Sequence, residues 1–396
     1  MNFESAVGFL KSFNPYEDKG FPAYNEKNFN LDRIRKFLKA YKVDYKKLKC
    51  VHVTGSKGKS SCCKMIGDYL VSSGYKTGVF TTPYILDITE CISVNGKDVS
   101  KKVFTEHVLC LKNFLKVYKG PILTYFEFLT VIVLKFFVDE KVDFAVIEVG
   151  LGGRLDATNV IKADVAVLAV VEKEHTGLLG RTYAKILDEK LGIAVGKNVR
   201  NLVVGRQIPY VEKIVRKKTS DVKNVVFVKE TGNRAIVFEV LKMLFKSVDE
   251  KIFDKVTANF GMIGRLDIRS YKGKWVVFDM AHTKNSVEFL LKELRKKNAD
   301  KKLYFLVSVM KNKNLKNVLL PICEAGSMVV VTSSNVDRGF MAEELRNYAK
   351  KHGFSVLADD DCESAFEDLL KKTGANNILV VTGSHFLVGR ILRRFF

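Results

Sequence analysis

The stretch Val53-Thr54-Gly55-Ser56-Lys57-Gly58-Lys59-Ser60-Ser61 decides the fold of this chain. It follows a short apolar segment, residues 50–53, and opens a helical pattern of apolar residues that runs to Leu70. A glycine-rich turn between a strand and a helix presents backbone N–H groups and a positive helix end to an anion. Lys59 is then placed to reach the outer phosphates of a nucleotide, and Ser60 or Ser61 to bind Mg²⁺. The alternative is an ordinary surface turn, because a full Walker A pattern would need Gly at position 53.

Length and composition indicate a folded globular protein of two or three domains. The chain has 396 residues, 47% of them hydrophobic, and no long polar tract. Its most apolar run, residues 125–138, is interrupted by Glu127 and Lys135 and is too short to span a bilayer. The N-terminus lacks the basic and apolar segments of a signal peptide, and the seven cysteines form no C-x-x-C pair. We therefore expect a cytoplasmic protein with reduced thiols and no zinc site.

The net charge of +22 raises the alternative of a nucleic-acid-binding protein. Runs such as Lys296-Lys297 and Lys350-Lys351 lie inside amphipathic helical patterns, and the basic residues form no single patch interleaved with aromatic residues. A general positive field that attracts polyanionic small substrates explains the charge without a nucleic-acid partner. The basic segment 389–396 is interpreted as the last helix of a core with snorkelling arginines, rather than as a membrane anchor.

Strand and helix patterns alternate along the chain, which predicts an α/β fold with parallel sheets covered by helices. In the first half we expect strands near 50–54, 77–81, 143–149, 165–171 and 201–205, and helices near 31–41, 59–73, 101–117, 124–139 and 183–197. The pattern loosens from about residue 222, and 245–260 is predicted as a helix that leads into a linker. A second, smaller doubly wound unit follows, with strands at 274–279, 302–309, 327–333 and 377–381 and helices at 286–297, 315–324, 342–352 and 363–372.

Two more predicted strand ends carry residues that suit a phosphate and metal site. Glu148 ends a buried strand and precedes a glycine turn, and ligands of open α/β sheets bind at the carboxyl ends of strands. Beside a phosphate loop, Glu148 is a candidate Mg²⁺ ligand, and His175 at the next strand end is a candidate for metal or phosphate. The structural alternatives are a capping carboxylate in a tight turn and a core histidine. By helical periodicity alone, Lys190 is a solvated lysine.

The phosphate loop is the first of several ordered motifs. The stretch from Glu148 to Asn159 reads E-V-G-L-G-G-R-L-D-A-T-N. The other motifs are Thr81-Thr82-Pro83-Tyr84-Ile85, Glu90-Cys91-Ile92, Asn95-Gly96, Thr124-Tyr125-Phe126-Glu127, Glu174-His175 with Leu179-Gly180-Arg181-Thr182, Glu189-Lys190-Leu191-Gly192-Ile193, Gly264-Arg265-Leu266-Asp267 and Asp279-Met280-Ala281-His282-Thr283-Lys284. Over essentially the whole chain, these motifs resemble those of the folylpolyglutamate and dihydrofolate synthases of the Mur ligase superfamily.

The resemblance implies both a fold and an activity. The fold would be α/β, with a P-loop Mur-ligase-like central ATPase domain on a parallel sheet (1–258) and a smaller Rossmann-like C-terminal glutamate ligase domain (259–396). The activity would be ATP-dependent amide ligation. A pteroate or folate carboxylate attacks the γ-phosphate of ATP, and the amino group of L-glutamate then displaces phosphate from the acyl phosphate. The implied partners are these small molecules only, with no nucleic acid and no membrane, and the chain is expected to be a monomer.

The resemblance also implies cofactors and residue roles. The cofactors are ATP and Mg²⁺, to which it adds a carbamylated Lys190 and a monovalent cation. Catalytic roles fall to Lys59, Lys190 and His282. ATP would be bound by Gly55, Ser56, Lys57, Gly58, Lys59, Ser60, Ser61, Arg265, Asp279 and His282. The metal would be bound by Ser60, Ser61, Thr82, Glu148, His175 and Lys190. The acceptor acid would be bound by Tyr84, Tyr125, Phe126 and Asp156.

Several positions depart from the family pattern and leave the substrate open. Lys57 replaces an asparagine of the phosphate loop, Glu174 an aspartate, and Tyr84 a histidine, while Thr283-Lys284 replaces Asn-Pro and puts the local turn in question. Three functions therefore stay open. The first is glutamate ligation to dihydropteroate, to reduced folates or to both; the second is a related ligase with a different acid or amino acid. The third is a non-catalytic or nucleic-acid-binding derivative.

Overall fold

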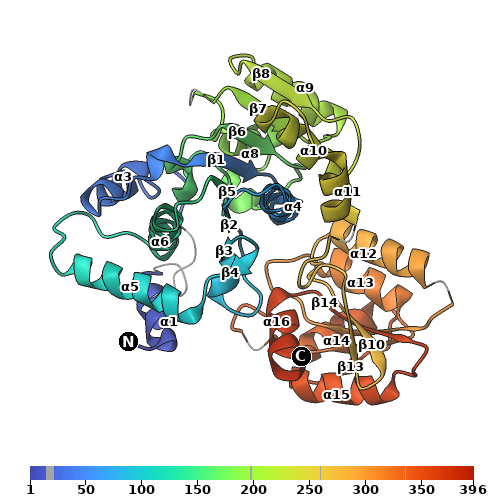
Figure 1. Ribbon diagram of the computed structural model, residues 1–396. Coiled ribbons are helices and arrows are strands. Elements are labelled where there is room, and N and C mark those ends of the chain that lie inside the picture. Colours follow the sequence, from blue (N-terminus) through green and yellow to red (C-terminus); the bar gives the residue numbers. More distant parts are fainter. Residues whose placement is uncertain (15–21, 197–198, 259, 299, 335) are drawn as a thin grey trace. The chain divides into compact units, whose positions relative to one another are not determined.

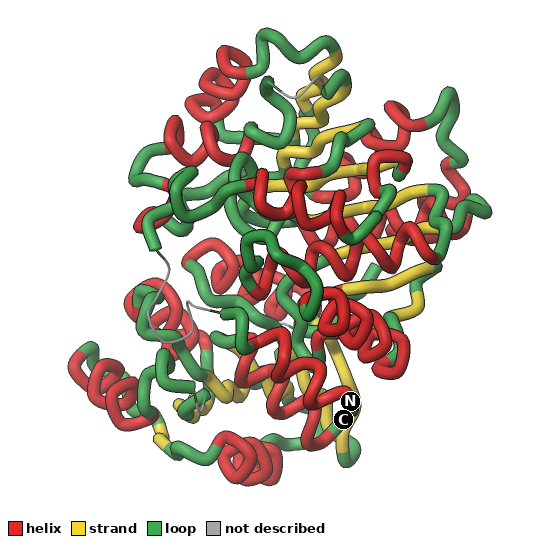
Figure 2. Tube along the Cα trace, turned by 90° about the vertical axis from the view of Figure 1, so that its left-hand side faces the viewer, coloured by secondary structure: helices red, strands yellow, loops and turns green. Residues whose placement is uncertain are grey.

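The computed structural model describes residues 1–14, 22–196, 199–258, 260–298, 300–334 and 336–396. The chain divides into two compact units, Met1–Phe260 and Gly261–Phe396. In each unit helices (red) enclose a sheet (yellow) (Figure 2). The predicted boundary adjoins residue 259, which lies outside the described residues, so the assignment of two functional domains at 1–258 and 259–396 stays a prediction.

The first unit is built on an eight-stranded sheet with the order β4-β3-β2-β5-β1-β6-β7-β8. Strands β2, β5, β1, β6, β7 and β8 run parallel, and β3 and β4 extend one edge as an antiparallel hairpin. The central strands are buried on both faces, which explains the near-continuous apolar sequences of β5 and β6. The strands are β1 (Lys49–Thr54), β2 (Thr77–Phe80), β3 (Ile92–Val94), β4 (Lys97–Asp98), β5 (Phe144–Glu148), β6 (Val165–Leu168), β7 (Asn201–Val204) and β8 (Asn224–Phe227).

Helices cover both faces of this sheet (Figure 1). α4 packs on β2 and β5 with α10 and α11 beside it, while α6, α3 and α1 build the core on the opposite face. Strand β1 serves both cores, because Cys50 faces the α6 side and Val51 the α4 side. The helices are α1 (Phe3–Lys11), α3 (Leu31–Ala40), α4 (Lys59–Ser72), α5 (Lys101–Leu115), α6 (Tyr125–Asp139), α7 (Thr176–Leu179), α8 (Tyr183–Leu191), α9 (Pro209–Lys218), α10 (Asn233–Leu244) and α11 (Glu250–Ala258), with short 3₁₀ turns at Tyr45–Lys47, Ile88–Cys91 and Ala157–Val160.

The second unit has a six-stranded sheet with the order β13-β12-β11-β14-β10-β9. All neighbours are parallel except β9, which pairs with β10 as an antiparallel edge strand. The last strand, β14, lies between β10 and β11, so three loops that are far apart in sequence end side by side. The elements are β9 (Asp267–Tyr271), β10 (Lys274–Phe278), α12 (Lys284–Lys297), β11 (Leu303–Val307), α13 (Leu315–Ala325), β12 (Met328–Val331), α14 (Ala342–Lys351), β13 (Leu357–Ala358), α15 (Cys362–Lys372), β14 (Ile378–Thr382) and α16 (His385–Phe395).

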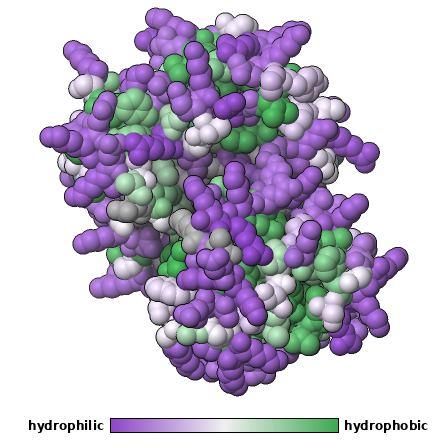
Figure 3. All heavy atoms as spheres, turned by 90° about the vertical axis from the view of Figure 1, so that its right-hand side faces the viewer, coloured by the Kyte–Doolittle hydropathy of each residue, from purple (hydrophilic) through white to green (hydrophobic). Residues whose placement is uncertain are grey.

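The basic residues are dispersed over the surface. Lys350 and Lys351 occupy the last turn of α14, where cations stabilise the negative end of a helix. Arg393 and Arg394 are exposed on α16, whose other side is buried, so the prediction of a final core helix is confirmed. One face of the molecule shows hydrophilic side chains over most of its area, with smaller hydrophobic areas between them (Figure 3). None of the helices in the described ranges combines the length and the apolar composition that a membrane span requires.

The structure confirms the predicted strands and helices and adds elements that the sequence patterns do not predict. Besides the 3₁₀ turns, the added elements are α1, β3, β4, α7, α9, β8, α10, β9 and β13. The predicted loosening from about residue 222 is wrong, because β8 and α10 lie there. β8 is a half-buried edge strand, and α10 begins after Gly232 without a side-chain cap, so both carry weak sequence signals. The predicted helix 183–197 ends at Leu191, and its last residue lies outside the described residues.

Candidate active site

The phosphate loop connects β1 to α4 in a conformation that requires glycine. Gly55 and Gly58 have φ of 148° and 86°. A Cβ atom on Gly55 would lie 2.8 Å from Cβ of Ala169, and one on Gly58 would lie 2.3 Å from Oδ1 of Asn233. The loop is thus pressed against β6 on one side and the start of α10 on the other. Neither glycine has a side chain of its own that would hinder the approach of a phosphate to the loop.

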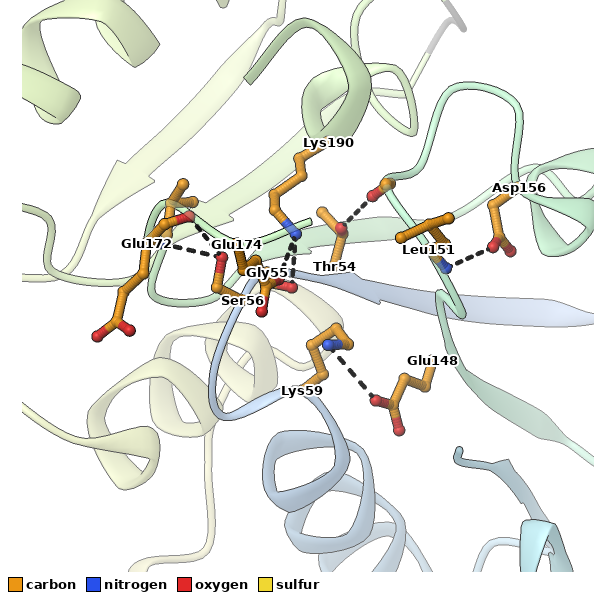
Figure 4. Close-up of polar contacts among 12 residues, drawn as sticks. Thr54, Gly55, Ser56, Lys59, Glu148, Leu151, Asp156, Glu172, Glu174 and Lys190 are labelled. Atoms are coloured by element: carbon orange, nitrogen blue, oxygen red, sulfur yellow. Dashed lines mark hydrogen bonds and ion pairs between the residues drawn. The ribbon is translucent and has the colours of Figure 1, made fainter. Parts of the chain in front are cut away.

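The segment after β6 holds the loop in place. The N–H groups of Ser56 and Lys57 both donate to the carbonyl oxygen of Val170, at 2.7 and 3.1 Å. The Ser56 hydroxyl accepts from the Glu172 N–H at 2.9 Å and donates to the Glu172 carbonyl oxygen at 3.1 Å (Figure 4). The Lys57 ammonium forms an ion pair of 3.0 Å with the Glu172 carboxylate. Ser56 and Lys57 therefore fix the shape of the loop, and their contact with ATP stays a prediction.

A buried carboxylate lies beside the start of α4. Glu148 is the last residue of β5 and only 1% exposed. Its carboxylate accepts hydrogen bonds from the Ser60 hydroxyl and from the Thr82 N–H, both at 3.1 Å. The Lys59 ammonium lies 3.9 Å from the same group, and the two side chains point toward each other (Figure 4). The structure thus brings together Lys59, Ser60, Thr82 and Glu148, as the sequence predicts.

The oxygen atoms of Glu148 and Ser60 are suitable ligands for Mg²⁺. Mg²⁺ prefers oxygen ligands and is usually held by one or two carboxylates, with waters and substrate phosphates completing its coordination. Glu148 and the Ser60 hydroxyl offer such oxygens, and Lys59 shows that the carboxylate already attracts a cation. In the described ranges, no three His, Cys, Asp or Glu side chains are grouped closely enough to hold a metal alone. The metal-binding roles of Ser60, Ser61, Thr82, Glu148, His175 and Lys190 therefore stay predictions.

Lys190 lies behind the loop and is buried, so the interpretation from periodicity as a solvated lysine is wrong. Its ammonium donates to the Gly55 carbonyl oxygen at 2.8 Å and to the Glu174 carboxylate at 3.1 Å (Figure 4). Burial lowers the pKa of Lys190 to about 8. Burial opposes ionisation of Glu174, but the charges of Lys190 and Lys59 outweigh it and lower its pKa. A small hollow is lined by Thr54, Gly55, Lys59, Val149, Gly150, Leu151, Gly152, Glu174, His175 and Lys190.

Two of the predicted acceptor residues, Asp156 and Phe126, lie against the glycine turn that forms one wall of this hollow. Asp156 is buried, and its carboxylate accepts from the Leu151 N–H at 2.8 Å and from the N–H and hydroxyl of Thr158 at 3.0 and 2.5 Å. Asp156 therefore shapes the turn, and its direct contact with a substrate stays a prediction. Phe126 reaches the turn as well, since a Cβ on Gly150 would lie 2.5 Å from its ring. The other two predicted acceptor residues, which are half-buried against the α6 core, are Tyr84 and Tyr125.

In the second unit, the predicted ATP residues gather where β10 ends. The Asp279 carboxylate is buried and accepts from the N–H groups of Leu266 and Ala281, both at 2.8 Å. Burial raises the pKa of Asp279, and the nearby charge of Arg265 opposes that shift. The His282 ring nitrogen Nδ1 lies 2.7 Å from the Met280 carbonyl oxygen, so Nδ1 carries the proton and Nε2 remains an acceptor. Burial and the charge of Lys313 lower the pKa of His282 to about 4.

The turn after His282 survives the replacement of Asn-Pro by Thr283-Lys284. Thr283 caps α12, with its N–H and hydroxyl each 2.9 Å from the Ser286 hydroxyl. The His282 N–H also donates to Ser286 at 3.1 Å. Lys284 is then the first residue of α12, a position that needs no special φ angle. Thr283 and Ser286 thus form a hydrogen-bonded turn that leads directly into α12.

Sequence reasoning missed a second group of residues in this unit. His385 begins α16, and burial with the charges of Arg338 and Lys313 lowers its pKa to about 4. The hydroxyl groups of Ser308 and Thr382 are buried without a hydrogen-bond partner among the described residues. These groups follow β11, β12 and β14, so the rule that ligands bind at carboxyl ends of strands is the signal that could have found them. Asn233, which contacts the phosphate loop, was missed because α10 was not predicted.

Comparison with known proteins identifies the family. The Mur ligase middle domain matches residues 53–269, more than half of the chain, and the Mur ligase glutamate ligase domain matches residues 264–385. A dihydrofolate synthase/folylpolyglutamate synthase of Buchnera aphidicola subsp. Baizongia pistaciae is 27% identical over 417 residues, covering 96% of this chain and 94% of the relative.

Solved structures share the fold. Folylpolyglutamate synthase of Mycobacterium tuberculosis complexed with ADP matches with a TM-score of 0.85 at 22% identity, covering 99% of this chain and 97% of that one. A bifunctional folylpolyglutamate synthase/dihydrofolate synthase with Mn, AMPPNP and L-glutamate bound matches with a TM-score of 0.83 at 22% identity, covering 99% and 98%. A bifunctional folylpolyglutamate synthase/dihydrofolate synthase from Yersinia pestis CO92 also matches, with a TM-score of 0.82 at 22% identity, covering 99% of this chain and 98% of that one. The predicted fold class is confirmed, and the chain belongs to the Mur ligase family, in the branch of the folylpolyglutamate and dihydrofolate synthases.

Proposed function

We propose that this chain is an ATP-dependent ligase that joins L-glutamate to dihydropteroate, to reduced folates or to both, through an acyl phosphate. One observation carries the proposal: Lys59, Glu148 and the buried Lys190 converge at the carboxyl edge of the parallel sheet, around a preformed phosphate loop. The family membership supports the same reaction, since the Buchnera relative is named for both synthase activities.

The reaction brings anions together, and the site is built to offset their charge. A carboxylate must approach the γ-phosphate of ATP, so the Lys59 ammonium and the N–H groups at the start of α4 would hold the phosphates and stabilise the charge that develops during transfer. Glu148 and Ser60 would hold Mg²⁺, which neutralises phosphate charge when bound. The glycine turn lets a substrate approach the backbone closely next to these groups. The acyl phosphate would then react with the amine of glutamate.

Lys190 is proposed to be carbamylated in the active enzyme. Carbamylation needs an unprotonated amine, and burial lowers the pKa of Lys190 to about 8, which raises the fraction of that form near neutral pH. The modified side chain would be an anion and would repel Glu174, so the loop would need a cation nearby. Carbon-13 NMR of protein incubated with labelled bicarbonate tests this, with Lys190→Arg as the control that cannot give the signal at this position.

The second unit would bind the amino acid. Lys313, Arg338 and the hydroxyls of Ser308 and Thr382 lie at neighbouring strand ends, and such cations and hydroxyls suit carboxylates. Arg265, Asp279 and His282 remain proposed contacts of ATP or of an ion bound with it, a monovalent cation included. Replacing Arg338 by Gln should raise the KM for glutamate more than the KM for ATP.

Product analysis tests the function directly. Purified protein, ATP, Mg²⁺ and L-glutamate are incubated with dihydropteroate in one tube and tetrahydrofolate in another, and the products are weighed by mass spectrometry. One glutamyl increment on dihydropteroate alone makes the enzyme a dihydrofolate synthase, and a ladder on tetrahydrofolate makes it a polyglutamate synthase. No increment in either tube, from folded protein that binds ATP, overturns the proposal.

The departures at Tyr84 and Thr283 favour one second candidate, a related ligase with another acid or amino acid. Screening acids and amines for ADP release separates it from the first, because only the correct pair would turn over ATP. We further propose a cytoplasmic monomer without nucleic-acid or membrane partners. Light scattering during size-exclusion chromatography tests the oligomeric state, and a duplex-binding titration across salt concentrations tests the nucleic-acid alternative.

A further inference from the structure

Strand β1 carries a buried histidine two residues before its end. His52 is 1% exposed and lies on the same face of the strand as Thr54, because side chains alternate along a strand. Its Nε2 atom lies 2.8 Å from the Thr158 hydroxyl. A buried histidine usually contributes to packing only. Whether His52 has a further role depends on the direction of its hydrogen bond to Thr158 and on the residues to which Thr158 is bonded in turn.

The direction of the hydrogen bonds follows from the donors available. The Thr158 hydroxyl lies 2.5 Å from the Asp156 carboxylate, which when ionised can only accept. Thr158 has one proton and gives it to Asp156, so His52 must donate Nε2–H to the Thr158 oxygen. Burial raises the pKa of Asp156, while hydrogen bonds from Thr158 and from the Leu151 N–H oppose that shift. Each donor in the chain therefore helps to keep the carboxylate charged.

The chain of hydrogen bonds ends on the glycine turn. Asp156 accepts from the Leu151 N–H at 2.8 Å, and the next residue, Gly152, accepts through its carbonyl oxygen from the Thr54 hydroxyl at 2.7 Å. β1 thus holds the turn at two adjacent residues, directly through Thr54 and indirectly through His52. The turn lines the hollow that also contains Lys59 and Lys190.

We propose that His52 is a positioning residue of the active site, which acts through Thr158 and Asp156 to fix the turn at residues 150–153 next to the phosphate loop. Its catalytic consequence rests on the proposed ligase function, whereas its effect on the turn does not. Loss of the His52 hydrogen bond would displace the turn and so weaken its contacts with a molecule bound in the hollow. The contacts of Val170 and Glu172 that hold the phosphate loop would be unchanged.

Two substitutions at one position separate positioning from packing. His52→Gln places an N–H donor near the position of Nε2, whereas His52→Leu fills the space without a donor. We expect His52→Leu to increase amide hydrogen exchange at Leu151 by about tenfold, and His52→Gln to restore protection. In the ligase assay, His52→Leu should lower kcat by about tenfold with little change in the KM for ATP. Thr219→Val, which removes a buried hydrogen-bond donor elsewhere in the same unit, is the control.

The outcomes distinguish the inference from the proposed function. Unchanged exchange at Leu151 in His52→Leu, or equal damage in His52→Gln and His52→Leu, overturns the positioning role. If the chain proves not to ligate glutamate, the exchange measurement still decides whether His52 fixes the turn. Should His52→Leu fail to fold, Thr158→Val and Thr158→Ser replace the pair, since only the serine variant keeps the hydroxyl. Equal exchange at Leu151 in those two variants would also overturn the role.

Discussion

The ammonium group of Lys190 donates a hydrogen bond of 2.8 Å to the carbonyl oxygen of Gly55, which ties α8 to the phosphate loop. Replacing Lys190 by Met would leave this oxygen and the Glu174 carboxylate without their buried donor. We expect kcat to fall by about 100-fold or more and the free energy of unfolding to fall by about 1–3 kcal/mol. Steady-state kinetics and urea unfolding measure both, and Lys185→Met, an exposed lysine of the same helix, is the control. An unchanged kcat would contradict the role of Lys190.

The ion pair between Lys57 and Glu172 should strengthen ATP binding modestly. The two side chains are 33% and 26% exposed, so the solvent screens the pair and its coupling energy should be about 0.5–1 kcal/mol. Lys57→Asn, which restores the family residue, and Glu172→Gln should each raise the KM for ATP by about two- to fivefold. The double variant decides between two roles. If Lys57 also contacts phosphate, Lys57→Asn will raise the KM for ATP more than Glu172→Gln does. If the two single effects on the KM add up in the double variant, Lys57 and Glu172 are not coupled.

Glu148 should control the dependence of the reaction on Mg²⁺. Glu148→Gln keeps the size of the side chain but removes the charge that attracts a cation beside Lys59 and Ser60. We expect kcat to fall by about 100-fold and the Mg²⁺ concentration for half-maximal rate to rise. Titration calorimetry without Mg²⁺ should show that Glu148→Gln keeps its affinity for ATP, because the substitution removes a negative charge near the phosphates. Glu140→Gln, which breaks an exposed pair with Lys76, should change none of these values.

Two histidines should make stability depend on pH. Burial, with the charges of neighbouring cations, lowers the pKa values of His282 and His385 to about 4, from an ordinary value of 6.5. Both are neutral in the folded protein at pH 7, and their contribution is complete above pH 6.5 and lost as the pH falls through 4. The free energy of unfolding should fall by on the order of 3 kcal/mol per histidine. In the double variant His282→Gln/His385→Gln, the free energy of unfolding in urea should depend less steeply on pH. His352→Gln, at an exposed histidine, should match the parent chain.

Much of the site at the sheet edge could be predicted because it is encoded by short, contiguous motifs. Lys59 follows the buried strand β1 and Glu148 ends the neighbouring strand β5, and parallel pairing brings these two strand ends together. The burial of Lys190 could not be predicted from periodicity. Its position on α8 is common for an exposed lysine, and only the carbonyl of Gly55, far away in sequence, explains why it points inward.

The residues that the sequence analysis did not identify are brought together by the order of the strands in the sheet, and this order cannot be predicted from the sequence patterns. Lys313, Arg338 and His385 follow three separate strands, and only the insertion of β14 between β10 and β11 brings His385 near the others. Asn233 was missed because α10 follows a glycine without a capping side chain. Asp156 was assigned to the acceptor by motif alone, whereas its hydrogen bonds show that it first serves the turn.

The hydrogen bond from Thr54 to the carbonyl oxygen of Gly152 has a consequence for evolution. It joins the loop for the nucleotide to the turn beside the hollow, so a substitution in either one disturbs the geometry of the other. Descendants of this protein can change the acid that they accept as substrate only through segments that this hydrogen bond does not constrain, such as residues 82–90. Selection for a new acceptor would therefore leave the two tied loops in place and act on their surroundings.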